Sequence, residues 1–304
     1  MKYFALVAAV AQLNLAVSAQ AHGSHQDMDV EVKNDITSEA LGSGIYLFKG
    51  LGGNIGVSVG EDGVFVIDDK FARFAEEIIT DIRALDNGPI RYVVNTHYHG
   101  DHTGGNAEMK AAGATIVAHD NVRKRMGMTF ENRILGRTQQ ASPEEQWPVV
   151  TFSENMTFHF NGQVVHVSHM PNAHTDGDAV IYFEQANILH MGDNYFNGML
   201  PYVDVDGGGS LQGMIEAQSR AIDMIGEDTQ IIPGHGPMAT TADLVKSRDM
   251  LVDIQSRVKS RMDAGQSLDT ILHDNPLVEY ADLAGGFIDL DSMVRITYRS
   301  LSGK

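Results

Sequence analysis

Three histidines and one aspartate lie within six residues of one another in the segment Asn95–Asn106 (NTHYHGDHTGGN), at His97, His99, Asp101 and His102. The segment directly follows an apolar run that is typical of a β-strand. In an extended chain His97 and His99 point to the same side, and the glycines that follow allow the backbone to turn sharply. Imidazole and carboxylate groups gathered in this way are typical ligands of a divalent metal ion.

Three more residues of ligand type occur later in the chain, each shortly after a short apolar run that predicts a strand: His174, Asp193 and His235. Loops at the ends of neighbouring strands can meet at one edge of a sheet. We therefore expect these three residues to converge with the first cluster. Each of them alone would more often be a structural residue, but their number and their common position after strands favour a metal site.

The composition limits the chemistry further. The chain contains no cysteine, which excludes disulfides, thiolate nucleophiles and cysteine-bound metals, so any metal ion must be held by His, Asp or Glu. Its 22 Lys and Arg residues against 40 Asp and Glu residues give a formal net charge of −18. This balance argues against a nucleic-acid partner, which would require a basic face. We expect a small-molecule substrate, and the sequence does not indicate the oligomeric state.

The N-terminal residues indicate export. A basic residue, an apolar run and the A-x-A site Ala19-Gln20-Ala21 predict a signal peptide over residues 1–21, with cleavage after Ala19 as the alternative. The apolar run is shorter than the ~20 residues that span a bilayer, so we expect no stable membrane insertion after cleavage. The mature protein is predicted to be periplasmic or secreted by a bacterium. The polar residues that follow, to about Ala40, are expected to be loosely held.

The remaining chain, residues 22–304, is predicted to form a single α/β domain. Apolar positions spaced three and four apart predict helices that include residues 71–85, 211–225 and 241–263. Short β-branched and aromatic runs predict strands in both halves. Two strand-rich halves, each followed by helices, favour two sheets packed face to face with helices outside. Residues 121–147 are less regular and form either a surface loop or a flap over a pocket.

The order of the candidate ligands resembles the metallo-β-lactamase superfamily. The resemblance covers residues 45–240 and depends on the H-x-H-x-D-H run together with the three later residues. It implies an αββα sandwich of two mixed sheets with two metal ions at one edge. It also implies that His97, His99 and His174 hold the first zinc ion, that Asp101, His102 and His235 hold the second, and that Asp193 bridges both.

A dizinc centre of this kind implies a metal-dependent hydrolase. A metal-bridging hydroxide attacks a carbonyl carbon, and the two zinc ions stabilise the charge that develops. Asp101 is given the catalytic role of orienting the hydroxide. Iron and manganese accept similar ligands, but His99 stands where flavodiiron proteins typically carry a glutamate, which favours zinc. Either Asp68 or Asp69 is expected to anchor a ligand imidazole, with a helix N-cap as the alternative.

Three hypotheses describe the function. The first is a β-lactamase-like hydrolysis of a cyclic amide, which the predicted export favours. The second is a lactonase or a thioesterase of the glyoxalase II type, because Asp193 stands where one branch of the lactamases has a cysteine. The third is a non-catalytic zinc-binding protein or chaperone, which the complete ligand set disfavours. Tyr195 and Asn197, in the loop after Asp193, are the candidate substrate contacts.

Overall fold

The computed structural model of the chain describes residues 36–303. The predicted signal peptide, residues 1–21, lies outside the described residues. Within the described part, no helix combines the length and the apolar character that a membrane span requires.

The first sheet has seven strands in the order β1-β2-β3-β4-β5-β6-β9. An antiparallel meander is formed by β1 (Thr37–Gly42), β2 (Ile45–Lys49), β3 (Ile55–Gly60) and β4 (Gly63–Ile67). Three parallel strands continue the sheet: β5 (Ile90–Val94), β6 (Thr115–His119) and β9 (Val150–Phe152). Strand β1 overlaps the segment that was expected to be loosely held. Its side chains are almost all exposed, so it carries no hydrophobic pattern and is held by its backbone pairing with β2.

The second sheet has five strands: β10 (Asn155–Phe160), β11 (Gln163–Met170), β12 (Asp178–Phe183), β13 (Ile188–His190) and β14 (Gln230–Ile232). They are antiparallel except for the parallel pair β13 and β14. The two sheets pack face to face through buried apolar side chains from both. The ring of Phe65 on β4, for example, lies 6.2 Å from that of Phe183 on β12.

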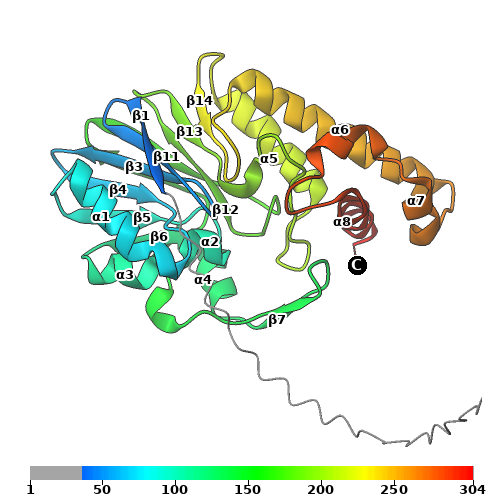
Figure 1. Cartoon of the computed structure of the whole chain (residues 1–304), viewed down its shortest axis with the longest axis horizontal. Helices are drawn as coiled ribbons and strands as arrows, with labels where there is room; N and C mark the ends of the chain where they lie inside the picture. The colour runs from blue at the N-terminus through cyan, green and yellow to red at the C-terminus, as the bar shows by residue number, and fades with distance from the viewer. Residues whose placement is uncertain (1–35, 304) are drawn as a thin grey trace, which may run out of the picture. The chain divides into compact units, whose positions relative to one another are not determined.

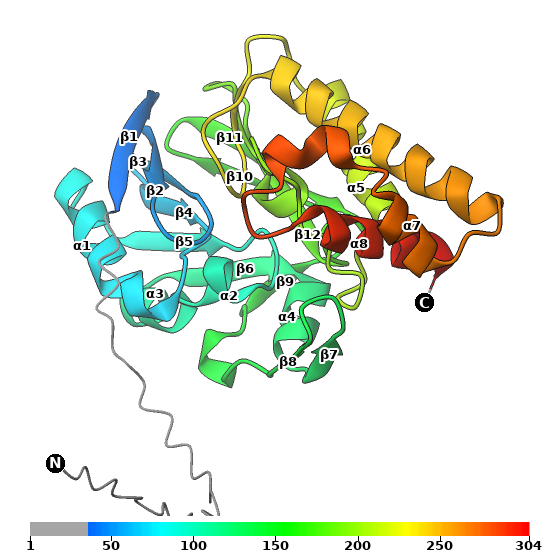
Figure 2. The same cartoon turned by 45° about the vertical axis from the view of Figure 1, so that its right-hand side comes forward.

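Helices cover the outer faces of both sheets (Figures 1 and 2). The first sheet is covered by α1 (Ala75–Leu85) and α3 (Asn106–Ala111). The short helix η1 (Ala72–Phe74) directly precedes α1. The second is covered by α5 (Leu211–Met224) and α6 (Thr241–Asp263), and α7 (Leu268–Asp274), η4 (Val278–Leu283) and α8 (Leu290–Ser302) pack against them. This arrangement confirms the predicted αββα sandwich.

The irregular segment 121–147 contains short elements that the sequence pattern did not predict. Helix α4 (Asp120–Met126) is followed by a small hairpin of β7 (Phe130–Asn132) and β8 (Arg137–Gln139), and by η2 (Glu144–Gln146). The hairpin is fastened to the rest of the protein through the buried side chain of Asn132, which donates hydrogen bonds to the Tyr202 hydroxyl and to Asp204.

One glycine fixes how α5 packs against the loop after β11. Gly213 lies in the first turn of α5, and a Cβ atom built there would lie 1.9 Å from the backbone oxygen of Asn172. The N-cap residue Ser210 joins the same two elements, because its hydroxyl accepts a hydrogen bond from the Gly213 amide and donates one to the Asn172 oxygen, both at 2.9 Å. This contact holds the loop in which His174 lies.

We predict that Gly213→Ala destabilises the protein, although Ala favours a helix over Gly by up to about 1 kcal/mol. The added methyl group must displace a backbone oxygen, and overpacking of this kind costs about 1–3 kcal/mol. Chemical denaturation measures the difference. Gln212→Ala on the exposed neighbouring position is the matched control and should stay within about 0.5 kcal/mol of the wild type. An equally or more stable Gly213 variant would show that α5 does not depend on this contact.

Candidate metal centre

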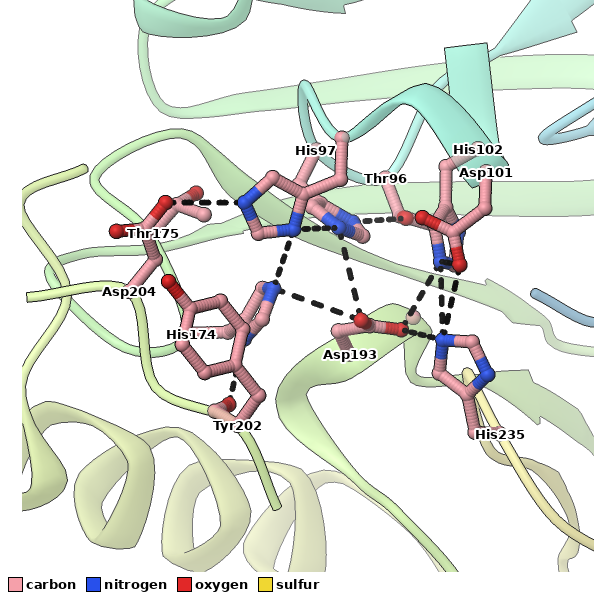
Figure 3. Close-up of polar contacts among 12 residues, drawn as sticks. Thr96, His97, Asp101, His102, His174, Thr175, Asp193, Tyr202, Asp204 and His235 are labelled. Carbon is pink, nitrogen blue, oxygen red and sulfur yellow. Dashed lines mark hydrogen bonds and ion pairs between the residues drawn. The ribbon is translucent and has the colours of Figure 1, made fainter. Parts of the chain in front are cut away.

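The structure brings all seven predicted ligands together at the ends of strands from both sheets (Figure 3). They form two groups, and within each group the candidate ligand atoms lie within 4.8 Å of one another. The first group is His97, His99, His174 and Asp193. The second group is Asp101, His102 and His235.

The chain after β5 supplies four of these residues through a change from extended to helical backbone. His99 is extended and forms the N-cap of α2 (Gly100–Thr103), a four-residue helix that contains Asp101 and His102. The sequence indicated a glycine-assisted turn at this place but not a helix. The extended residues serve the first group, and the helical residues serve the second.

Two imidazoles of the first group are each held through one ring nitrogen. His174 Nδ1 donates to the backbone oxygen of Tyr202 at 2.8 Å. His99 Nε2 donates to the carboxylate of Asp204 at 3.0 Å. Since a carbonyl or carboxylate oxygen only accepts, the proton of each neutral ring must lie on the anchored nitrogen. His174 Nε2 and His99 Nδ1 therefore carry a lone pair.

The third imidazole, His97, is oriented through a hydroxyl. The Thr96 hydroxyl donates to Asp68 at 2.8 Å, so it can only accept from His97 Nδ1, which lies 3.0 Å away. This arrangement leaves a lone pair on His97 Nε2 as well.

The three lone pairs point into one small space. His97 Nε2 and His174 Nε2 lie 3.1 and 3.0 Å from His99 Nδ1. Burial lowers the pKa of His97 well below its usual value and that of His174 to about 4, so these rings stay neutral. A set of bare imidazole nitrogens beside the carboxylate of Asp193 is suited to a cation, and zinc prefers such donors.

In the second group, His102 is surrounded by carboxylates. Its Nδ1 lies 2.7 Å from Asp68, and its Nε2 lies 3.1 Å from Asp193 Oδ1 and 3.6 Å from Asp101 Oδ2. Burial opposes protonation of the ring, but the charges of Asp193, Asp101 and Asp68 raise the pKa of His102 well above its usual value. The Nε2 edge of the ring is therefore a place where the protein stabilises positive charge.

His235 completes the second group. Its Nε2 lies 3.3 Å from Asp101 Oδ2 and 3.4 Å from Asp193 Oδ1. Despite partial burial, Asp193 and Asp101 raise the pKa of His235 to about 9. Within residues 36–303 its ring makes no hydrogen bond through Nδ1, and it is positioned instead by stacking on Phe196, with 5.1 Å between ring centres and 13° between planes.

Asp193 joins the two groups. It lies in η3 (Gly192–Asn194), and its Oδ2 faces the first group, 3.5 Å from His174 Nε2 and 3.7 Å from His97 Nε2. Its Oδ1 faces the second group and is buried without a hydrogen bond among the described residues. Although burial opposes ionisation, the surrounding imidazoles hold the pKa of Asp193 well below its usual range. One carboxylate thus presents an oxygen to each group, as a bridging ligand would.

The close approach of this carboxylate requires glycine nearby. A Cβ atom at Gly234 would lie 2.1 Å from Asp193 Oδ1, and one at Gly53 would lie 2.2 Å from the ring of His102. Larger side chains at either position would push a ligand out of place.

Of the two aspartates predicted to anchor a ligand, the structure selects Asp68. It accepts hydrogen bonds from the Thr96 amide and hydroxyl and contacts His102 Nδ1. Asp69 instead accepts from the Gly105 amide. Neither acts as an N-cap, because α1 and η1 begin after Phe74 and Phe71. Asp68 has a positive φ of 61°, a strained conformation that is held by these bonds.

Asp204, which the sequence analysis missed, anchors His99 in the same way. It is buried and also accepts hydrogen bonds from the Tyr98 hydroxyl and from the Gly207 amide. Although burial opposes ionisation, the hydrogen bonds from His99, Tyr98 and Gly207 hold the pKa of Asp204 well below its usual range. No feature of the sequence distinguishes Asp204 from Asp206 two residues later.

The predicted substrate contacts, Tyr195 and Asn197, have their polar groups committed to the protein. The Tyr195 side chain packs in the core beneath α5 and α6, and its hydroxyl donates to Asn197 Oδ1 at 3.0 Å. The Asn197 amide donates to the backbone oxygens of Pro237 and Met238. Both residues line a cavity of about 250 Å³ whose walls include none of the seven candidate ligands. This arrangement does not support a direct substrate contact by either residue.

Comparison with known proteins agrees with this geometry. The family model described as the metallo-beta-lactamase superfamily matches residues 49–235. Among curated proteins, a hydroxyacylglutathione hydrolase of Erythrobacter litoralis is 29% identical over 108 residues, which is 35% of each chain. One of Methylococcus capsulatus is 33% identical over 106 residues, 34% of each chain. The matched part of the chain thus spans about a third of the length of these relatives.

Solved structures show the same fold. A metallo-beta-lactamase from Pontibacter korlensis superposes with a TM-score of 0.62 at 19% identity, covering 72% of this chain and 99% of the other. A sec-alkylsulfatase from a Pseudomonas species superposes with a TM-score of 0.64 at 17% identity, covering 87% of this chain and 50% of the other. Because the family model spans more than half of the sequence, the chain belongs to the metallo-β-lactamase superfamily.

Proposed function

We propose that the chain is an exported dizinc hydrolase that cleaves an activated carboxyl bond, a thioester or a lactone. The observation that carries the proposal is the position of Asp193, whose two oxygens face two separate ligand groups. Two bound zinc ions would supply a water molecule that ionises near neutral pH and would polarise the substrate carbonyl. The residues of the chain hold, orient and shield that centre.

Asp101 is the residue we propose to position the reacting water. Its side chain is 22% exposed, whereas that of Asp193 is only 5% exposed. Although burial opposes ionisation, His102 and His235 hold the pKa of Asp101 well below its usual range, so its carboxylate accepts hydrogen bonds throughout the neutral range. A partly exposed carboxylate beside the second group can orient a water molecule by accepting its hydrogen bond.

The substrate class is supported by the names of the curated relatives, which are both hydroxyacylglutathione hydrolases. The absence of cysteine from the chain supports the same choice, because Asp193 takes the position of a cysteine found in one branch of the lactamases. Cyclic amides are the second candidate. The leader-like residues 1–21 favour them, because export would bring the enzyme to where β-lactams act.

Loss of a ligand should remove metal and activity together. We predict that Asp193→Ala and His174→Ala each lower the zinc content of the reconstituted protein and reduce kcat/KM by more than 100-fold, the upper range for residues that merely support a ligand. Elemental analysis and the hydrolysis assay measure the two effects. His166→Ala, at an exposed histidine bonded to Glu184, is the matched control and should change neither. Full turnover by either ligand variant would contradict the assignment.

A substrate panel separates the candidate functions. We expect the zinc-loaded protein to hydrolyse thioesters or lactones, and we expect a chelator to abolish and zinc to restore this activity. Turnover confined to a chromogenic cephalosporin would favour the cyclic-amide candidate. A protein that binds two zinc ions but hydrolyses none of these compounds would support the non-catalytic zinc-binding hypothesis.

Export is tested by processing of the full chain in a Gram-negative host. We expect the protein in the periplasmic fraction with His22 as its N-terminal residue, or Gln20 if cleavage follows Ala19. Arg at both positions 19 and 21 should block cleavage, because the peptidase site requires small residues there. N-terminal sequencing and cell fractionation give the result, and an unprocessed cytosolic protein would refute export.

A further inference from the structure

Phe287 has the most exposed large apolar side chain among the described residues, at 64%. It lies in the loop between η4 and α8, directly after Gly285 and Gly286. Single exposed apolar residues are common on protein surfaces. Phe287 differs from such residues because it contacts Tyr202, which itself contacts the first ligand group.

The ring of Phe287 lies one aromatic residue away from the first ligand group. It packs edge-on against Tyr202, with 5.8 Å between ring centres and 88° between planes. The Tyr202 ring in turn lies 5.9 Å from the ring of His99 and 5.7 Å from that of His174. One aromatic residue, Tyr202, therefore separates the exposed phenyl group of Phe287 from the first ligand group.

The loop that carries Phe287 is held in this place by the chain around Tyr202. The Leu200 amide donates to the Leu283 oxygen at 3.0 Å, and a Cβ atom at Gly286 would lie 3.6 Å from the sulfur of Met199. Figure 2 shows the segment before α8 running back toward the strands. We call Met199, Tyr202 and Phe287 the apolar wall.

The cationic side chains near the apolar wall are paired with oxygen acceptors of the same chain. Arg133 and Arg299 both bind the carboxylate of Asp206. The buried Lys70 donates to the backbone oxygen of Gly53. Because Tyr202 is only 5% exposed, Phe287 and the partly buried Met199 are the uncharged apolar groups that the wall can offer to a bound molecule.

We propose that the apolar wall binds the apolar acyl group of the substrate and that Phe287 is a specificity residue for aromatic acyl groups. The inference rests on the proposed hydrolase function and adds the substrate class to it. An aromatic group placed against the exposed face of Phe287 is removed from water and gains a ring contact, which corresponds to about a tenfold preference over a small acyl group.

The first experiment compares acetyl and phenylacetyl thioesters of the same thiol with the zinc-loaded protein. The wild type should show a kcat/KM about tenfold higher for the phenylacetyl compound, mainly through a lower KM. Phe287→Ala should lower kcat/KM for the phenylacetyl compound about tenfold and so remove this preference, and Phe287→Leu should retain part of it. Val278→Ala, at a 59% exposed position in η4, is the matched control and should keep the full preference.

The second experiment measures binding without turnover. Calorimetry compares acetohydroxamate and phenylacetohydroxamate on the same zinc-loaded proteins, and only the wild type and the Val278 control should bind the phenyl compound about tenfold more tightly. A phenyl preference that persists in Phe287→Ala, or is absent from the wild type, overturns the inference while leaving the hydrolase proposal intact. Failure of the full chain to bind zinc overturns both.

Discussion

The site depends on one electrostatic constraint: the buried ring nitrogens His97 Nε2 and His174 Nε2 both lie within 3.1 Å of His99 Nδ1. Hydrogen bonds fix the proton of each ring on its other nitrogen, at His97, His99 and His174. Burial removes protonation as an alternative for His97 and His174, so their lone pairs are the donors that a metal ion would use. A metal ion bound between these nitrogens would relieve their mutual repulsion.

The two groups meet this requirement differently. Each imidazole of the first group is anchored by a hydrogen bond, whereas in the second group only His102 has such an anchor and His235 is positioned by stacking on Phe196. The second group instead gathers carboxylates, which raise the pKa of its imidazoles. The first group would therefore hold a cation through fixed nitrogen geometry and the second through negative charge, and Asp193 faces both groups.

The sequence predicted the seven ligands because their types are rare together and each shortly follows a strand. It also predicted the sandwich, since the helices and most strands carry clear apolar periodicity.

The sequence did not predict α2, whose four residues are too few for a periodic pattern, or β1, whose exposed side chains carry none. Asp204 was not predicted because its role depends on its contact with the His99 ring. The path of a loop determines which aspartate makes such a contact, and no local sequence pattern indicates it. Tyr195 was expected at the substrate, but its burial in the core was not readable from a loop sequence.

The candidate ligands and the C-terminal helices lie in different parts of the chain. The family match covers residues 49–235, and all seven candidate ligands lie within this range. The helices beyond it contribute no ligand, but they pack on α5 and bring the loop with Phe287 beside Tyr202. Tyr202 holds His174 through its backbone and contacts Phe287 through its ring. The C-terminal helices and the candidate ligands are thus linked through Tyr202, and also through the pairing of Arg299 in α8 with Asp206, two residues after the anchor Asp204.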